Sequence, residues 1–457
     1  MMKQFTEEYL DRIRRIIDEH NDAEARKALA DLHPADIAEL YADLDLAEAE
    51  YLFRLLDEEK AADVLMELDE DDRRKLLSGM DVEDIAKQID HLDTDDAVDV
   101  IQELDEEERE KILSHIDDVE QAGDIIDLLK YDEDTAGGLM GTEMIVVNEN
   151  WSMPETIRQM RLQAEDMDEI YYVYVVDNED RLRGILPLKK LITHPSVSKI
   201  KHVMETEPFS VKADTPIDEV AIDFEKYNLV AMPVVDSIGR LVGRITVDDV
   251  MDEVRESSER DYQLASGLST DIESSDNLFS QTKARLPWLL IGMVGGLCNS
   301  MILGNFEAGF VADPALALFI PLIGGTGGNV GVQASAIVVQ GLANGKLELK
   351  NAGKQIGREV IVALMNAVVI SGAVLAYVLI TQPHYYAVAF AVAASLFCVV
   401  IFATVFGTLV PLTLERLKIN PALATGPFIQ IMNDVVGLLI YVAMSTWMLK
   451  LIPLPTV

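Results

Sequence analysis

The stretch Pro421–Leu449, PALATGPFIQIMNDVVGLLIYVAMSTWML, decides the architecture of this chain. It is longer and more apolar than the ~20 residues that a helix needs to cross a bilayer, so we expect a membrane span here. Asp434 lies in its middle. A charged residue at that depth costs about 2.5–3.5 kcal/mol on insertion scales, which makes an acid there a candidate functional residue.

Helical spacing predicts that Gly426, Gln430, Asp434 and Tyr441 share one face, with Gly437 beside them. The opposite face carries Leu, Val and Ile. We therefore expect the polar face to look into protein or water, where a lone carboxylate most readily binds a cation. An intramembrane acid that only hydrogen-bonds a neighbouring helix is the alternative.

The charge of the chain is divided unevenly. Residues 1–282 hold 29 Lys and Arg against 73 Asp and Glu, whereas residues 283–457 hold 9 against 6. A large acidic soluble part therefore precedes an apolar membrane part. Acidic surfaces repel nucleic acid, so we expect no DNA or RNA partner. The two cysteines, Cys298 and Cys398, offer neither a disulfide framework nor a zinc site, as suits a cytoplasmic soluble part.

Residues 1–130 predict an acidic, all-helical domain. Short apolar helices recur behind Asp, Ser or Thr at N-cap positions, as in LHPADIAELYADLD (32–45). The pattern is typical of a superhelical, α-solenoid-like stack. Asp95, Asp96 and Asp99 are expected on its outward ridge. Asp95 and Asp99, one helical turn apart, repel each other unless a cation or a basic group lies between them.

Residues 131–255 predict a mixed α/β module that occurs twice. EMIVVNEN (143–150) and YYVYVVD (171–177) read as strands, and the same order of elements returns from FSVKAD (209–214). PVVDSIGRLVGRITVDDV (233–250) resembles the end of a CBS motif. In CBS pairs the matching Thr and Asp bind the ribose of an adenine nucleotide, which implies a possible ATP site at Thr246 and Asp249.

The first copy of the module departs from this pattern. It has Pro187, Lys189 and Lys190 where the hydroxyl and the acid would stand. A CBS pair that only dimerises and transmits a signal is therefore the alternative to nucleotide binding. Residues 256–285 follow as a connecting helix and a linker. We expect that helix to run straight into the membrane part.

Five apolar stretches predict five membrane spans, at about 286–304, 314–340, 360–380, 387–412 and 421–449. Lys and Arg precede the first span and lie between the second and third and between the fourth and fifth, but are absent from the other two loops. The positive-inside rule then places the N-terminal domains in the cytoplasm and the C-terminus outside a multi-pass cell (inner) membrane. Other acids of this part, such as Glu307 and Asp313, lie near span ends.

The second span contains the glycine-rich stretch IGGTGGNVGVQ (323–333), which permits close helix approach or local unwinding. Asn329 and Gln333 add amide oxygens beside it. Glycine-rich packing without a further role is the alternative to a polar path.

Taken in order, YDEDTAGGLM (131–140), the CBS ending, IGGTGGNVGVQ and NPALATGPFIQIMNDVVGLLIY (420–441) resemble the MgtE family of magnesium channels over the whole chain. The resemblance implies a multidomain fold without enzymatic activity. Its parts are a cytosolic superhelical α domain (1–130), a tandem α/β CBS pair (131–255), a connecting or plug helix (256–285) and a five-helix transmembrane domain (286–457).

The resemblance also implies a homodimeric channel for Mg²⁺ uptake, with a pore between the subunits. In that pore Asp434 selects Mg²⁺, and Gln430, Gly426 and Asn329 lie beside it. Mg²⁺ bound between the cytosolic parts is expected to hold the pore shut. The residues implied in that regulation are Asp95, Asp99, Asp252, Glu256, Glu259 and Asp261.

Three positions differ from the family pattern. Val332 and Gly426 stand where members often have Asn, and Asn228 replaces an acid of the second CBS motif. A proton- or sodium-coupled exchanger of broader divalent selectivity is the alternative function. An aspartyl intramembrane protease needs paired acids, and the core of the spans holds a single Asp.

Overall fold

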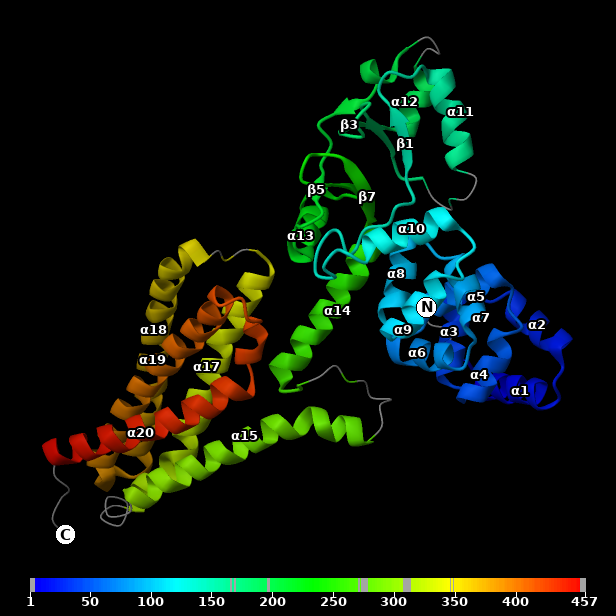
Figure 1. The fold of residues 1–457 in the computed structure, drawn as a ribbon. Coiled ribbons are helices and arrows are strands. Elements are labelled where there is room, and N and C mark those ends of the chain that lie inside the picture. The colour runs from blue at the N-terminus through cyan, green and yellow to red at the C-terminus, as the bar shows by residue number, and fades with distance from the viewer. Residues whose placement is uncertain are drawn as a thin grey trace. The chain divides into compact units, whose positions relative to one another are not determined.

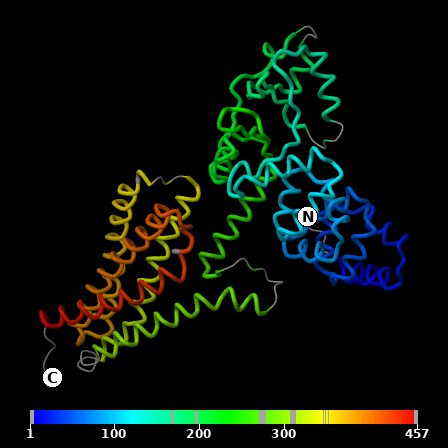
Figure 2. The backbone as a smooth tube through the Cα atoms, in the orientation of Figure 1, coloured from blue at the N-terminus to red at the C-terminus, as the bar shows by residue number. Residues whose placement is uncertain are grey.

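The structure is a computed structural model that describes residues 5–164, 167, 170–194, 198–269, 272, 278–306, 314–345, 347 and 349–452. Glu307 and Asp313 lie outside the described residues. The chain divides into two compact units, Met1–Asp252 and Glu253–Val457. Figure 1 labels the elements and Figure 2 traces the backbone.

Ten short helices form the N-terminal part of the first unit (Figure 1, blue to cyan). The carboxylates of Asp45, Asp57, Asp69 and Asp118 accept hydrogen bonds from backbone N–H groups in the first turns of the helices that follow. Acidic N-caps of this kind satisfy donors that have no partner inside the helix. The helices are α1 (Glu7–Asp18), α2 (Asp22–Ala30), α3 (Pro34–Ala42), α4 (Leu46–Phe53), α5 (Glu58–Glu67), α6 (Glu70–Ser78), α7 (Val82–Ile89), α8 (Thr94–Gln102), α9 (Glu106–Leu113) and α10 (Val119–Leu128).

Alternate helices of this part lie side by side: α3 contacts α5, α5 contacts α7, α7 contacts α9, and α8 contacts α10. Leu40, Leu65 and Ile101 are fully buried between them. The apolar side chains of successive helices thus share one core, and the predicted superhelical α domain is confirmed.

Two small sheets with the same internal order follow in the first unit. Strand order is β1-β2-β3-β4 in the first sheet and β5-β6-β7 in the second. In each, the first two strands are parallel and the next pair is antiparallel, which confirms the tandem α/β pair. The elements are β1 (Ile145–Asn148), α11 (Met153–Gln163), β2 (Val173–Val176), β3 (Leu182–Leu186), α12 (Leu188–Thr193), η1 (Ile200–His202), β4 (Glu205–Thr206), β5 (Val211–Lys212), α13 (Ile217–Tyr227), β6 (Ala231–Val235) and β7 (Leu241–Thr246).

Helices α13 and α14 (Val247–Ser266) both end at a residue with a left-handed backbone conformation. Asn228 ends α13 with φ +52°, a conformation that Asn tolerates better than an acid with a longer side chain. Helix α14 continues directly from β7 and ends before Gly267, which has φ +83°. The expectation that this helix runs straight into the membrane part is therefore wrong. The next helix begins only at Leu278.

Among the described residues of the second unit, five helices are long and apolar enough to cross a membrane, as predicted. Helix α19 lies at the centre, since α17, α18 and α20 all pack against it, while α15 packs on α20. The elements are α15 (Leu278–Asn305), η2 (Pro314–Phe319), α17 (Ile320–Ala343), η3 (Leu349–Asn351), α18 (Ala352–Thr381), η4 (Pro383–Tyr385), α19 (Tyr386–Arg416), η5 (Pro421–Ala424) and α20 (Pro427–Leu451).

The fifth span is broken near its start. The 3-10 turn η5 is followed by Thr425 and Gly426, and α20 begins only at Pro427. Proline disfavours helical backbone in the residue before it, and Gly426 accordingly has φ −86° and ψ −108°. Gly426 is the N-cap residue of α20, and its carbonyl accepts a hydrogen bond from the Gln430 N–H at 3.2 Å. It therefore lies one turn before Gln430, at the start of the helix and not within it.

Candidate cation sites and a tyrosine-lined pocket

Three carboxylates gather where the start of α8 meets the segment that leads into β1. Asp93, Asp95 and Glu143 each offer an oxygen, and these oxygens all lie within 4.8 Å of one another. We call these three residues the acid cluster. Asp95 and Glu143 are half-buried, whereas Asp93 is exposed.

Thr94 fixes the two halves of the acid cluster together. Its backbone N–H donates to Glu143 Oε1 at 2.9 Å, and its hydroxyl donates to Glu143 Oε2 at 3.2 Å. The N–H of Thr142 donates back to the Thr94 hydroxyl oxygen at 2.9 Å. Gly141 makes this approach possible, because a Cβ there would lie 2.8 Å from both Asp95 Oδ2 and Glu143 Oε2.

The surroundings of α8 disfavour negative charge. Burial raises the pKa of Asp95 well above its usual range, and the charges of Asp249, Asp96, Glu143 and Asp93 raise it further. Burial, followed by the charge of Asp249, raises the pKa of Asp96 to about 7. Burial also raises the pKa of Asp249 against the hydrogen bonds that it accepts from Thr246. A bound proton or a bound cation relieves this repulsion.

One basic side chain reaches the acid cluster. Arg244 donates from Nη2 to Asp93 Oδ2 at 3.3 Å and from Nε to the backbone oxygen of Glu143. Among the described residues, no ion pair joins Asp95 or Glu143 to a basic group. The cluster therefore keeps carboxylate oxygens available, and oxygen ligands are those that Mg²⁺ prefers.

The structure distributes the predicted regulatory acids in different ways. Asp95 lies in the acid cluster and near Asp249, but Asp99 is exposed one turn further along α8. Asp95 and Asp96 are half-buried, so the expectation that they form an outward ridge with Asp99 is wrong. Their burial follows from the packing of the helical domain against the CBS pair, which no pattern within residues 1–130 reveals.

The acids of α14 have other partners or face solvent. Asp252, Glu256 and Glu259 are exposed, and Glu256 lies 3.9 Å from Arg260, which also pairs with Glu253 at 3.0 Å. Asp261 accepts a hydrogen bond from Asn420 Nδ2 at 2.8 Å. In the part of the chain that the structure describes, none of them belongs to a group of three possible metal ligands.

Sequence reasoning missed Asp93 and Glu143. Glu143 follows YDEDTAGGLM by three residues, and Asp93 is the N-cap residue of α8. Each residue alone reads as an ordinary solvated acid. Only the fold brings the two positions together, because they lie far apart in the sequence.

Asp434 lies on α20 against the glycine-rich face of α17. It is half-buried, and its Oδ1 lies 3.3 Å and 3.6 Å from the positions that Cβ atoms would take at Gly324 and Gly328. A larger residue at either position would crowd the carboxylate. Gln430 on α20 and Asn329 on α17 are exposed. The structure thus brings Asp434 and Gln430 to the same side of α20, as predicted from their spacing.

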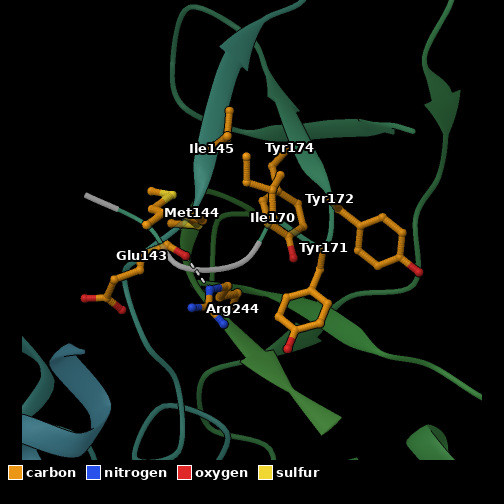
Figure 3. A pocket seen from close by; sticks show the side chains of 9 residues that line it. Glu143, Met144, Ile145, Ile170, Tyr171, Tyr172, Tyr174 and Arg244 are labelled. Atoms are coloured by element: carbon orange, nitrogen blue, oxygen red, sulfur yellow. Dashed lines mark hydrogen bonds between the residues drawn. The ribbon is translucent and has the colours of Figure 1, made fainter. Parts of the chain in front are cut away.

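A pocket in the CBS pair lies next to the acid cluster. The pocket has a volume of about 10 Å³, and the residues that line it include Tyr171, Tyr172, Tyr174, Arg244 and Glu143 (Figure 3). The Arg244 guanidinium carbon lies 5.9 Å from the centre of the Tyr171 ring. The buried hydroxyl of Tyr174 has no hydrogen-bond partner among the described residues. In this arrangement the space holds about one water molecule.

The two residues predicted to bind ribose, Thr246 and Asp249, lie together and are hydrogen-bonded to each other. The backbone N–H of Thr246 donates to Asp249 Oδ2 at 3.0 Å, and its hydroxyl donates to the same oxygen. Asp249 also faces the charges of α8. Negative charge on this side of the CBS pair favours a cation over a nucleotide phosphate.

Comparison with known proteins decides the family. The model of divalent cation transporters, MgtE, matches residues 320–444, that of the MgtE intracellular N domain matches residues 32–134, and that of the CBS domain matches residues 136–196 and 200–256. The magnesium transporter MgtE of Thermus thermophilus is 34% identical over 71% of this chain and 72% of its own length. The chain belongs to the MgtE family.

Further MgtE relatives agree. The magnesium transporters MgtE of Enterococcus faecalis and Bacillus subtilis are 32% and 33% identical over 72% and 70% of this chain, and over 73% and 70% of their own lengths. A crystal structure of the cytosolic domain of the Mg²⁺ channel MgtE in complex with ATP matches with a TM-score of 0.50 and 32% identity, over 53% of this chain and 98% of that one. Membership of the MgtE family confirms the predicted multidomain fold and a membrane transport protein that is not an enzyme.

Proposed function

We propose that this protein is a channel that carries Mg²⁺ into the cell and is held shut by Mg²⁺ bound on its cytosolic side. Asp434 is the observation that carries the proposal. It is a half-buried carboxylate against the glycine face of α17, and the sequence has no Lys or Arg between Lys418 and Lys450. An acid without a basic partner in a membrane span is best explained by a passing cation.

The chemistry of Mg²⁺ suits this environment. The ion gives up its waters reluctantly and prefers octahedral oxygen ligands. A carboxylate that is only half-buried can hold such an ion through its waters, and weak binding also lets the ion leave. The MgtE relatives are named as magnesium transporters, which supports Mg²⁺ as the transported ion.

The proposal includes a homodimer. Gln430 and Asn329 are exposed in a single chain, although amides are costly against lipid. A second copy that presents the same face would give these amides and Asp434 a common polar path. We propose this path as the pore, with the N-terminal domains in the cytoplasm and the C-terminus outside, as the distribution of basic residues predicts.

We place the regulatory ion at the acid cluster and the adjoining Asp249. Three carboxylate oxygens within 4.8 Å and a raised pKa at Asp95 fit a bound divalent cation. A bound ion would remove the repulsion between the helical domain and the CBS pair. The acids of α14, including Asp252, Glu256, Glu259 and Asp261, remain proposed contributors to closure, as does Asp99.

Substitution of Asp434 tests the pore proposal. We expect Asp434→Asn to lower Mg²⁺ uptake into liposomes about tenfold or more, because the charge that attracts the ion is lost. Glu415→Gln, an acid at the end of α19, should keep uptake within about twofold. Retained uptake in Asp434→Asn would remove this acid from the mechanism. Flux that vanishes at equal pH and sodium on both sides would instead favour a coupled exchanger.

A second ligand is supported by the tyrosine-lined pocket. The matching cytosolic domain was crystallised with ATP. The tyrosine-lined pocket of this chain has a volume of about 10 Å³, room for about one water molecule, so Tyr171 and Arg244 must move apart before an adenine and a phosphate can lie between them. We propose that an adenine nucleotide binds here. In this proposal Thr246 and Asp249 serve the cation side of the CBS pair instead of the ribose.

Matched variants distinguish the two nucleotide positions. Tyr171→Ala should weaken ATP binding to the full-length protein about tenfold, because it removes a stacking surface. Thr246→Val, which keeps the side-chain shape, should change it less than about twofold. Calorimetric titration with ATP measures both. The reverse order of effects would return the nucleotide to the Thr246 and Asp249 site.

A further inference from the structure

Asn433 is a buried amide without a partner in the membrane part. Its side chain is 1% exposed, and neither Oδ1 nor Nδ2 has a hydrogen-bond partner among the described residues. The buried hydroxyls of Thr404 and Thr408 on α19, by contrast, donate to carbonyls one turn earlier, at 2.9 Å and 2.8 Å, whereas Asn299 Oδ1 on α15 also lacks a partner among the described residues. Native proteins seldom leave such a group unpaired, because its lost hydration is not recovered. Neither lipid nor a second copy of the chain can reach it, since its own chain covers it.

The amide of Asn433 lies directly against the backbone of α17. A Cβ at Gly331 would stand 1.9 Å from Asn433 Nδ2, so the amide fills the space that a side chain would take. Gly407 of α19 approaches Gly331 as well, because a Cβ there would lie 2.3 Å from the Gly331 oxygen. Three helices therefore meet at Gly331, and a polar group is wedged between two of them.

The same face of α17 also covers Asp434. Gly324, Gly328 and Gly331 follow one another at helical spacing, and the Asp434 carboxylate lies against the first two. Asn433 and Asp434 are consecutive on α20. Any shift of α17 along α20 at Gly331 therefore also changes how far Asp434 is covered.

We infer that Asn433 is a positioning residue that makes the packing of α17 on α20 two-state. Its amide is unpaired in the arrangement described here. It gains a partner when α17 shifts and a backbone carbonyl of α17, which has a second lone pair, comes within reach. The shifted arrangement uncovers Asp434 for the ion. This inference rests on the proposed role of Asp434 in the pore.

Asn433→Leu tests the inference, because leucine has a similar size and needs no hydrogen bond. It stabilises the arrangement described here and removes the hydrogen bond of the shifted one. In the full-length protein in liposomes, we expect the maximal rate of Mg²⁺ uptake to fall about fivefold, with less than about twofold change in the half-saturating Mg²⁺ concentration. The melting temperature should rise. Asn433→Ala also removes the amide, so we expect it to lower the maximal rate as well. It serves as the test if the leucine variant does not assemble.

Gly331→Ala provides the reciprocal variant. Its methyl group takes the place of the amide, so we expect faster uptake than in the parent chain, and Asn433→Ala added to it should return the rate toward the parent value. Ser445→Ala, a buried polar residue of α20 that contacts Ser395 at 3.4 Å, is the control and should leave the rate unchanged. Maximal rates within about twofold of the parent in both Asn433 variants overturn the inference. Asp434→Asn measured alongside separates the outcomes, since retained uptake there overturns the pore proposal itself.

Discussion

The carboxylates of Asp95 and Asp96 on α8 lie in surroundings that favour a bound proton or a bound cation. Asp95 and Asp96 are half-buried beside Asp249, and Arg244 reaches Asp93 instead of either of them. The favourable contacts around Thr94 hold these acids close together against their repulsion. Their mutual repulsion therefore depends on the protons and cations in solution, as the proposed regulation by Mg²⁺ requires.

The raised pKa values predict how pH changes this repulsion. Between the usual pKa of an acid and the value of about 7 at Asp96, the folded protein binds protons that the unfolded chain releases. The free energy of unfolding therefore falls as pH rises through this window and levels off above it. Because Mg²⁺ competes with these protons, we expect it to protect residues 141–143 and α8 from hydrogen exchange more strongly at about pH 8 than at about pH 6. Asp96→Asn should shrink that difference, and a larger effect of Mg²⁺ at the lower pH would contradict the prediction.

At the scale of the elements, the packing of α17 against both α19 and α20 depends on glycine. Gly331 lies between Asn433 of α20 and Gly407 of α19, so the helices approach at their backbones. Close approach of this kind gives strong van der Waals contact in a membrane, where burial of apolar surface gives no driving force. It also leaves the helices sensitive to a single added methyl group.

Gly407→Ala measures that sensitivity. A Cβ at Gly407 would lie 2.3 Å from the oxygen of Gly331, so we expect the variant to lose about 1–3 kcal/mol of stability. Gly372→Ala on α18 is the matched control, because nothing lies within 4 Å of its Cβ position. The control should be neutral or gain about 0.5–1 kcal/mol from helix propensity. Thermal unfolding in detergent compares the two, and equal melting temperatures would mean that α17 and α19 are less tightly packed than described.

Elements were predictable from the sequence where one physical signal dominates. Long apolar stretches predicted the five spans, and Asp N-caps predicted the short helices. The break before Pro427 was missed, since apolar composition continues across Gly426 although the backbone does not. The acid cluster was found only through Asp95. Asp93 and Glu143 join it through tertiary packing, and the unpaired amide of Asn433 depends on a neighbour, Gly331, on another helix.

At the scale of the whole molecule, the chain consists of a highly charged part followed by an apolar part. Residues 1–282 carry nearly all of the acids, whereas residues 283–457 hold six of them. The acidic part can therefore respond to cations in water, and the apolar part can present a single carboxylate, Asp434, at the depth of the bilayer. Helix α14 contains the boundary between the two compact units. It is continuous across that boundary.

In the proposed mechanism, loss of the acid cluster leaves the proposed pore active but unregulated. We expect Asp95→Asn to raise the internal Mg²⁺ concentration that stops uptake about tenfold, because a ligand of the acid cluster is lost while Asp434 is intact. Asp127→Asn, an exposed acid of α10 paired with Lys130, should shift it less than about twofold. Uptake into liposomes loaded with graded Mg²⁺ gives both values, and Asp99→Asn measured in parallel reports whether that exposed acid contributes. If Asp95→Asn instead abolished uptake at every internal Mg²⁺ concentration, the acid cluster would serve assembly of the channel instead of its closure.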